Sequence, residues 1–141
     1  MNIYDCFTFN DENEILEIRL NELDKYVDYF VIVEAGETHR GKPKIKSISD
    51  SIITKFKSKI RYYYIDGFDK NYKPWQRENF QRNYIKHGLY DAKKEDIIIL
   101  SDVDEIPNLK KFNFKEVNNF VFGFLQAHTM YKFNLIREYD W

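Results

Sequence analysis

Two aspartates separated by one residue are the strongest chemical signal in this sequence. Asp102 and Asp104 directly follow four apolar residues, Ile97–Leu100, which favour a buried strand. Two carboxylates this close together in a tight loop can share Mg²⁺ or Mn²⁺, which can also bridge the oxygens of a diphosphate. An acidic turn without a ligand is the alternative interpretation. The preceding strand favours a metal site, at the carboxyl end of a central strand where open α/β sheets bind their ligands.

Two other acidic motifs do not fit the residues around this pair. A calcium-binding EF-hand loop that began at Asp102 would need glycine where Pro107 stands. A phosphatase of the haloacid dehalogenase type needs further catalytic elements downstream, and only 36 residues (141 − 105) follow Glu105. Glu105 adds a third carboxylate to the loop and is the nearest candidate for a catalytic base.

A charged helix is predicted before this strand, and its residues fall into two rows. Arg77 and Gln81 stand four residues apart on one face, while Glu78 and Arg82 form a second row with the same spacing. Arginine suits a diphosphate because its planar guanidinium donates paired hydrogen bonds and stays charged. One row could therefore reach a ligand and the other could form a salt bridge. The alternative is an exposed helix that is stabilised only by its own ion pairs.

Hydrophobic periodicity predicts strands that alternate with helices. A capping-box spacing of Asp11 and Glu14 marks the start of the first helix. This order predicts an α/β fold with three layers and a mostly parallel central sheet. We expect strands at 3–9, 29–33, 60–65, 97–100 and 120–125, and helices at 12–26, 49–57 and from Pro74 to about Gly88. Residues 36–50 are expected to form a loop in which Lys42, Lys44 and Lys46 face solvent.

Composition excludes several classes of protein. The 141 residues carry 22 Lys and Arg against 23 Asp and Glu, and this near-neutral charge argues against a nucleic-acid surface. Basic and aromatic residues do interleave between Lys55 and Tyr64, so an RNA-binding or interaction domain is an alternative, although strand alternation explains most of that segment. The single cysteine, Cys6, excludes an internal disulfide and is expected to be buried. No apolar run is long enough for a membrane helix, and charged residues that begin at Asp5 leave no room for a signal peptide, so we expect a soluble, cytoplasmic protein.

Several ordered blocks of this sequence resemble glycosyltransferase family 17, the family of the β-1,4-mannosyl-glycoprotein β-1,4-N-acetylglucosaminyltransferases. The resemblance covers nearly the whole chain, and agreement over many positions is more specific than a lone Asp-x-Asp motif. The blocks that carry it are Ile3–Phe9, Leu16–Leu23, Val27–Ala35, Thr38–Pro43, Arg77–Asn83 and Ile98–Pro107.

The resemblance implies a single GT-A type, Rossmann-like domain over residues 1–141 that binds a nucleotide sugar. It implies Asp102 and Asp104 as the metal pair, UDP-N-acetylglucosamine as the donor and inversion at the sugar carbon. An Arg-Asn pair in the wider GT-A group resembles Arg82-Asn83 and lies at the nucleotide pocket. Glu34, at the carboxyl end of the second expected strand, is a candidate contact to the base or ribose, and the alternative is that it caps the next turn. Together with the helix row of Arg77 and Gln81, the candidate donor-binding residues are Glu34, Arg77, Gln81, Arg82, Asn83, Asp102 and Val103.

The chain also departs from that family. Family members are usually considerably longer, the eukaryotic ones carry an amino-terminal membrane anchor, and GT-A enzymes take the acceptor site and the catalytic base from a second half. We therefore expect a domain that is truncated at its carboxyl end. The alternative function is a module that binds the donor without turnover. His128 could approach the site, and apolar surface left by a missing half would favour a homodimer.

Overall fold

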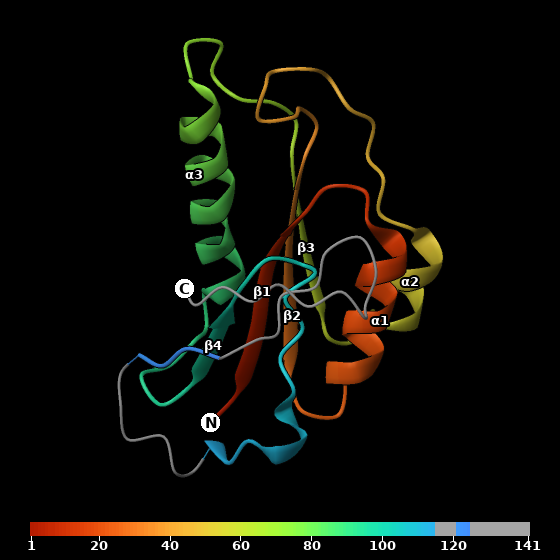
Figure 1. The fold of residues 1–141 in the computed structure, drawn as a ribbon, viewed down its shortest axis with the longest axis vertical. Coiled ribbons are helices and arrows are strands. Elements are labelled where there is room, and N and C mark those ends of the chain that lie inside the picture. The colour runs from red at the N-terminus through yellow and green to blue at the C-terminus, as the bar shows by residue number, and fades with distance from the viewer. Residues whose placement is uncertain (115–120, 125–141) are drawn as a thin grey trace, which may run out of the picture. The chain divides into compact units, whose positions relative to one another are not determined.

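The computed structural model describes residues 1–114 and 121–124. In this part of the chain, a four-stranded sheet has the order β3-β2-β1-β4, and each pair of neighbouring strands is parallel. Helices α1 and α2 lie on one side of the sheet and α3 lies on the other (Figure 1). The predicted α/β class with a parallel sheet is confirmed. The elements are β1 Ile3–Phe9, α1 Asn13–Leu23, β2 Tyr29–Ala35, α2 Asp50–Lys55, β3 Ile60–Ile65, α3 Pro74–Tyr84 and β4 Ile97–Leu100.

The chain divides into two compact units, residues 1–106 and 107–141, and the first contains the sheet and helices α1, α2 and α3. The described part of the second unit has a short 3₁₀ helix, Leu109–Lys111, and a stacked pair of rings, Phe112 and Phe122, with centroids 5.2 Å apart. Residues 121–124 have no regular secondary structure, so the strand predicted there is not found. The remaining residues of that prediction, 120 and 125, and His128 lie outside the described residues.

The core is built on the two central strands, β1 and β2, whose side chains are almost all buried. Successive side chains of a strand point to opposite faces of the sheet, so each of these strands contributes buried side chains to both faces. Cys6 is buried as expected, and this burial raises the pKa of its thiol. One cluster comprises Tyr4, Cys6, Val31, Val33, Ala35, Ile65, Phe68 and Ile85. Other buried residues of these strands and of α1 are Phe7, Phe9, Leu16, Leu20, Leu23, Phe30 and Ile32.

Strand β4 lies at the edge of the sheet formed by the described residues, where the sequence predicted a central, buried strand. Ile99 is buried, but the side chains of Ile98 and Leu100 are 48% and 58% exposed. A run of four apolar residues can form a strand that is covered on one face or on both faces, so the sequence could not distinguish an edge strand from a central one. Leu100 pairs with Cys6, so β1 continues to Phe9 beyond the end of β4.

The first helix is shorter than predicted, and the capping box predicted from Asp11 and Glu14 does not form. Helix α1 begins at Asn13, after Glu12 as the N-cap residue, with no capping bond from that residue's side chain. The Glu12 carboxylate instead accepts hydrogen bonds from the backbone N–H groups of Asn10 and Asp11, both at 3.1 Å. Glu12 therefore stabilises the turn that leads into α1.

The third helix also ends earlier than predicted, because the chain tightens into a 3₁₀ helix over Ile85–Leu89. A Cβ atom at Gly88 would lie 2.3 Å from a methyl group of Val31, so the backbone packs directly on β2 at this point. Arg61 of β3 donates hydrogen bonds to the Gly88 carbonyl at 2.8 Å and to Asp91 at 2.6 and 2.8 Å. The hydrogen bond from Arg61 is the main cause that lowers the pKa of Asp91 to about 2.

The segment that suggested RNA binding pairs most of its basic residues with acids. The ammonium groups of Lys55 and Lys59 lie 3.6 and 3.1 Å from the carboxylates of Glu17 and Asp24. Arg61 is held by Asp91 and lies over the ring of Tyr29, with its guanidinium carbon 3.8 Å from the ring centre. The interleaved pattern therefore runs from the end of α2 into β3, and most of its basic side chains are paired with acids of neighbouring segments.

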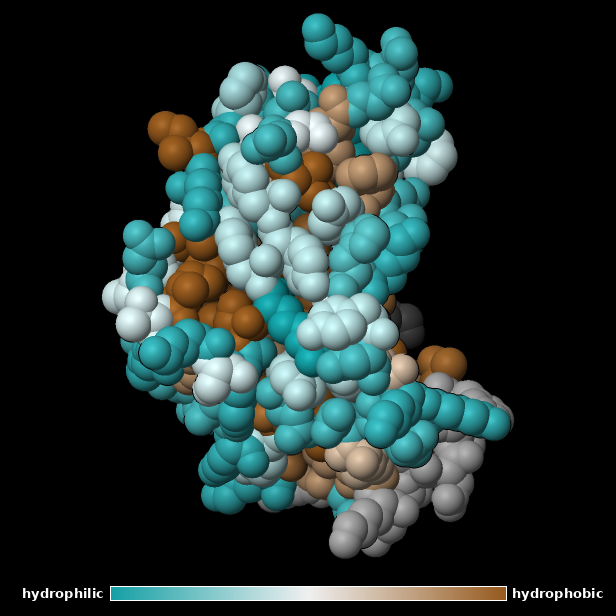
Figure 2. Space-filling view, turned by 180° about the vertical axis from the view of Figure 1, so that it is seen from behind, coloured by the Kyte–Doolittle hydropathy of each residue, from teal (hydrophilic) through white to brown (hydrophobic). Residues whose placement is uncertain are grey.

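Exposed apolar side chains come from different elements of the chain. Seen from behind, the molecule is mostly hydrophilic or of intermediate hydropathy, with a hydrophobic area on the left of the view (Figure 2). Ile18, Ile45 and Trp75 are exposed on α1, on the loop after β2 and on α3. Within residues 1–114 and 121–124, no helix has the length and apolar character that crossing a membrane requires.

Candidate functional site

The acidic loop after β4 closes on itself through reciprocal hydrogen bonds. The Glu105 carboxylate accepts a bond of 2.9 Å from the Asp102 N–H, and the Glu105 N–H donates to the Asp102 carbonyl at 3.0 Å. Ser101 donates its N–H to the Cys6 carbonyl at 3.3 Å, which ties the loop to β1. Asp104 lies exposed in this turn, and its carboxylate has no partner in the part of the chain that is described. The loop thus presents one unpartnered carboxylate to solvent.

A buried arginine holds the interior side of this loop. Arg19 of α1 is fully buried, and its Nη1 donates to the carbonyl oxygens of Asp102, Val103 and Glu105 at 2.7, 3.2 and 3.1 Å. Its Nη2 donates to the Ser101 hydroxyl at 2.7 Å. One guanidinium therefore fixes the backbone of three of the five residues from 101 to 105 and the side chain of a fourth.

Asp5 of β1 compensates the charge of this arginine. Its two carboxylate oxygens accept bonds of 2.8 and 2.7 Å from Nε and Nη2 of Arg19, and both side chains are 0% exposed. The Arg19 guanidinium also lies over the ring of Phe7, 4.6 Å from its centre. A buried charge needs a partner and satisfied hydrogen bonds, and this pair meets both conditions.

A second arginine reaches the loop from the other side of the sheet. Arg82 of α3 donates to a carboxylate oxygen of Asp102 at 2.8 Å, and its Nε lies 3.5 Å from the carboxylate of Glu78. The salt bridge proposed for one row of this helix is therefore confirmed. The structure also brings together Arg82 and Asp102, two of the residues predicted for the donor site. Asp102 is held by its backbone from Arg19 of α1 and by its side chain from Arg82 of α3. These two helices lie on opposite sides of the sheet (Figure 1).

The other row of α3 faces the loop after β2. The Gln81 side-chain amide donates to the Val33 carbonyl and its oxygen lies against a ring nitrogen of His39, both at 2.9 Å. Arg77 donates to the His39 carbonyl at 3.3 Å, and its buried Nε has no partner among the described residues. Gly41 has a φ of +78°, and a Cβ atom there would lie 2.4 Å from a nitrogen of Arg77. Arg77 and Gln81 therefore position this loop, and Asn83 lies exposed.

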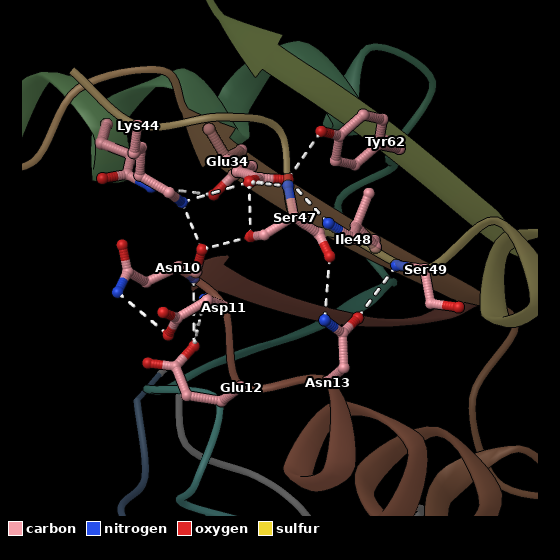
Figure 3. Close-up of polar contacts among 12 residues, drawn as sticks. Asn10, Asp11, Glu12, Asn13, Glu34, Lys44, Ser47, Ile48, Ser49 and Tyr62 are labelled. Carbon is pink, nitrogen blue, oxygen red and sulfur yellow. Dashed lines mark hydrogen bonds and ion pairs between the residues drawn. The ribbon is translucent and has the colours of Figure 1, made fainter.

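Glu34 forms the centre of a separate polar network at the carboxyl end of β2 (Figure 3). Its fully buried carboxylate accepts bonds of 2.8 Å from the Ser47 N–H, the Ser47 hydroxyl and the Tyr62 hydroxyl. Lys44 completes the network with an ion pair of 3.1 Å. The structure does not place Glu34 in contact with Asp102 or Arg82. It places Glu34 as the anchor of the loop between β2 and α2.

Lys44 is not the freely solvated lysine that its sequence pattern predicted. Its side chain is only 14% exposed, and besides Glu34 it donates to the Asn10 carbonyl at the end of β1. Asn13 continues the connection, because its amide donates to the Ser47 carbonyl at 2.8 Å and its oxygen accepts from the Ser49 N–H at 2.9 Å (Figure 3). The loops after β1 and β2 are thus bound to each other.

Replacing Glu34 with Gln is expected to alter the pH dependence of stability. Burial raises the pKa of Glu34, but the hydrogen bonds from Ser47, Tyr62 and Lys44 outweigh it, and the pKa lies below its ordinary value. The ionised carboxylate therefore stabilises the fold above about pH 4.3, and this contribution is lost as the pH falls through the folded-state pKa. Glu34→Gln should lower the free energy of unfolding at pH 7 by about 1–3 kcal/mol and flatten its slope below about pH 5.

Urea unfolding of this variant between pH 3 and 7 measures both effects, with Glu14→Gln as the control because Glu14 is exposed on α1. An unchanged slope in the Glu34 variant would contradict the anchoring role.

The donor atoms of the acidic loop fit a hard divalent cation. No group of three or more His, Cys, Asp and Glu side chains that could hold a metal comes together in residues 1–114 and 121–124. Mg²⁺ commonly binds through one or two carboxylates and completes its coordination with water and substrate phosphates. The carboxylates of Asp102 and Asp104 match this pattern, and Val103 between them is buried. The loop therefore fits a cation that is shared with a bound diphosphate.

The sequence interpretation missed Asp5 and Arg19, although both carry a recognisable signal. Arg19 falls on the buried stripe of its helix with Leu16, Leu20 and Leu23, and Asp5 interrupts an apolar strand. Charged residues at positions that must be buried indicate a pair. Their combination could have predicted an ion pair, although not its contact with the acidic loop.

Fold and site together define the class of this protein. A parallel sheet of order β3-β2-β1-β4 is Rossmann-like. In such folds the order of the strands along the chain reverses between β1 and β4. The acidic loop lies at the carboxyl end of β4, on that edge of the sheet where ligands bind. The model of the family described as Glycosyltransferase family 17 matches residues 1–140, so the chain belongs to that family.

Curated relatives agree with this assignment. The chain is 24% identical over 115 residues to proteins from Rattus norvegicus, Homo sapiens and Mus musculus, each named β-1,4-mannosyl-glycoprotein 4-β-N-acetylglucosaminyltransferase. The match covers 74% of this chain but only 21–22% of the relatives, so the chain spans about a fifth of their length. No solved structure matches the chain.

Proposed function

We propose that this chain is the nucleotide-sugar-binding part, of GT-A type, of a metal-dependent inverting glycosyltransferase. The proposed donor is UDP-N-acetylglucosamine and the acceptor is a glycan. The observation that carries the proposal is the acidic loop, in which Asp102 is fixed from two sides and Asp104 is left free to bind, in a chain of this family. The names of the relatives, which act as N-acetylglucosaminyltransferases, support the choice of donor.

Each residue of the site has a definite part in this proposal. Asp102 and Asp104 would hold Mn²⁺ or Mg²⁺, which when bound neutralises charge on the UDP leaving group. Arg82 is partly exposed and already pairs with an anionic oxygen, so it can donate to a diphosphate oxygen instead. In the reaction, an acceptor oxygen forms a bond to the sugar carbon as the bond from that carbon to UDP breaks, and a base takes the acceptor proton.

A donor-binding module without turnover is the second candidate, and the position of Glu105 favours it. This residue was the predicted base, but its carboxylate accepts the Asp102 N–H and thereby stabilises the loop. No other described residue is placed at the loop as a base. The two candidates share the donor site and differ only in whether sugar is transferred.

Titration of UDP and UDP-N-acetylglucosamine into the protein tests the shared site directly. We expect calorimetry to show binding in the presence of Mn²⁺ and a loss of binding when a chelator is added, because the loop carboxylates and the diphosphate are both anionic and repel without the cation. Absence of binding with Mn²⁺ present would contradict the proposed function. Release of UDP with an added glycan acceptor would then distinguish a transferase from a binding module.

A further inference from the structure

The contacts of Arg19 account for every hydrogen-bond donor that an arginine possesses. Its Nε and Nη2 hold the Asp5 carboxylate, Nη2 also holds the Ser101 hydroxyl, and Nη1 is shared among three backbone carbonyls of the loop. Lysine has three donors at one point and no planar fork, so it could not reproduce this set. The side chain is therefore specific for this loop conformation.

The direction of these bonds determines what the loop can offer on its outer side. The carbonyls of Asp102, Val103 and Glu105 turn inward to Nη1, so they are engaged and do not compete as cation ligands. The side chain of Asp102 remains partly exposed and Asp104 is exposed, while Val103 is buried.

We propose that Arg19, held in place by Asp5, is a positioning residue that shapes the loop of residues 101–105 so that its aspartates form the cation site. This inference rests on the proposed function, because the cation is the ligand for which the loop is shaped. Groups that orient metal ligands without touching the metal typically change its affinity by about 10–100-fold when they are replaced. Arg19 acts through the backbone of Asp102 and through that of Val103 and Glu105, which flank Asp104, and belongs to this kind of group.

The test compares Arg19→Lys with the unaltered protein in two measurements. Hydrogen exchange of the metal-free protein reports the loop itself, and we expect faster exchange at the amides of Asp102 and Glu105 with little change at the amides of β2. Titration with Mn²⁺, followed by electron paramagnetic resonance, should show an affinity about tenfold lower or more. The control is Arg40→Lys, because Arg40 is exposed in the loop after β2.

Ser101→Ala provides a second variant that leaves the buried charges paired, in case Arg19→Lys does not fold. It removes one partner of Nη2 and should weaken Mn²⁺ binding in the same direction, by a smaller factor. A purely structural Arg19 would lower the melting temperature of the variants and leave the Mn²⁺ affinity of the folded protein unchanged.

Loop exchange and Mn²⁺ affinity that both stay at the level of the unaltered protein would overturn the inference. If the unaltered protein itself bound no Mn²⁺, the proposed metal site would fail, and with it the claim that the loop is shaped for a cation. The exchange data would still show whether Arg19 shapes the loop, so the two failures are distinguishable.

Discussion

Replacing Asp5 with Asn is expected to lower the free energy of unfolding by about 3–5 kcal/mol, the effect typical of removing one partner from a buried ion pair. Asp5 and Arg19 are both fully buried, and the carboxylate accepts two charge-assisted bonds from the guanidinium. Asparagine keeps the shape of the side chain but leaves the Arg19 charge uncompensated in the interior. Urea unfolding at pH 7, followed by circular dichroism, measures the change.

Glu17→Gln is the matched control for this prediction. Glu17 lies on the same helix as Arg19, but its ion pair with Lys55 spans 3.6 Å and both side chains are about half exposed, 54% and 51%. Solvent screens such a pair, so its loss should cost no more than about 1 kcal/mol. A similar small loss in Asp5→Asn would mean that the buried pair does not stabilise the fold, whereas a large difference would locate the effect in burial.

The order of the elements could be predicted from the sequence because each one carries a local pattern. Helix α1 repeats Leu16, Leu20 and Leu23 at helical spacing, and β2 is a continuous apolar run that fits a strand covered on both faces. Pro74 marks the first turn of α3. These signals depend on residues a few positions apart, so they can be recognised without knowledge of the tertiary structure.

The parts that the sequence could not provide depend on contacts between distant residues. Arg19 meets the carbonyls of the acidic loop across more than 80 positions, and Glu34 meets Tyr62 across 28. Whether β4 is central or at an edge depends on what packs beside it, which its own four residues do not encode. Among the described residues, the pairing of Arg82 with Asp102 is the one long-range hydrogen bond for which both residues were named as site candidates, since each stood in a motif of its own.

The two aspartates of the loop differ in what else they do, and this difference gives the sharpest test of the metal site. The Asp102 side chain already pairs with Arg82, and its backbone is bound to Arg19 and Glu105. A change at this residue therefore alters an ion pair as well as any metal ligand. Asp104 has no side-chain partner in the part of the chain that is described, so its role in stability is small.

Replacing Asp104 with Asn should therefore abolish Mn²⁺-dependent binding of UDP without unfolding the protein. Loss of a direct ligand exceeds the loss from an orienting residue, so we expect the affinity for UDP with Mn²⁺ to fall by more than about 100-fold. The free energy of unfolding should change by no more than about 0.5 kcal/mol, because the substitution is at an exposed position. Calorimetric titration of UDP with Mn²⁺ and with chelator, together with urea unfolding, measures both quantities.

Asp66→Asn is the matched control, since Asp66 is also an exposed aspartate that directly follows a strand of the same sheet. This variant should bind UDP with unchanged metal dependence. If Asp104→Asn did the same, Asp104 would not be a metal ligand, and the exposed carboxylate of the loop would have no part in donor binding. If Asp104→Asn lost binding while the control kept it, the effect could not be assigned to net charge, because both variants remove one carboxylate from the same edge of the sheet.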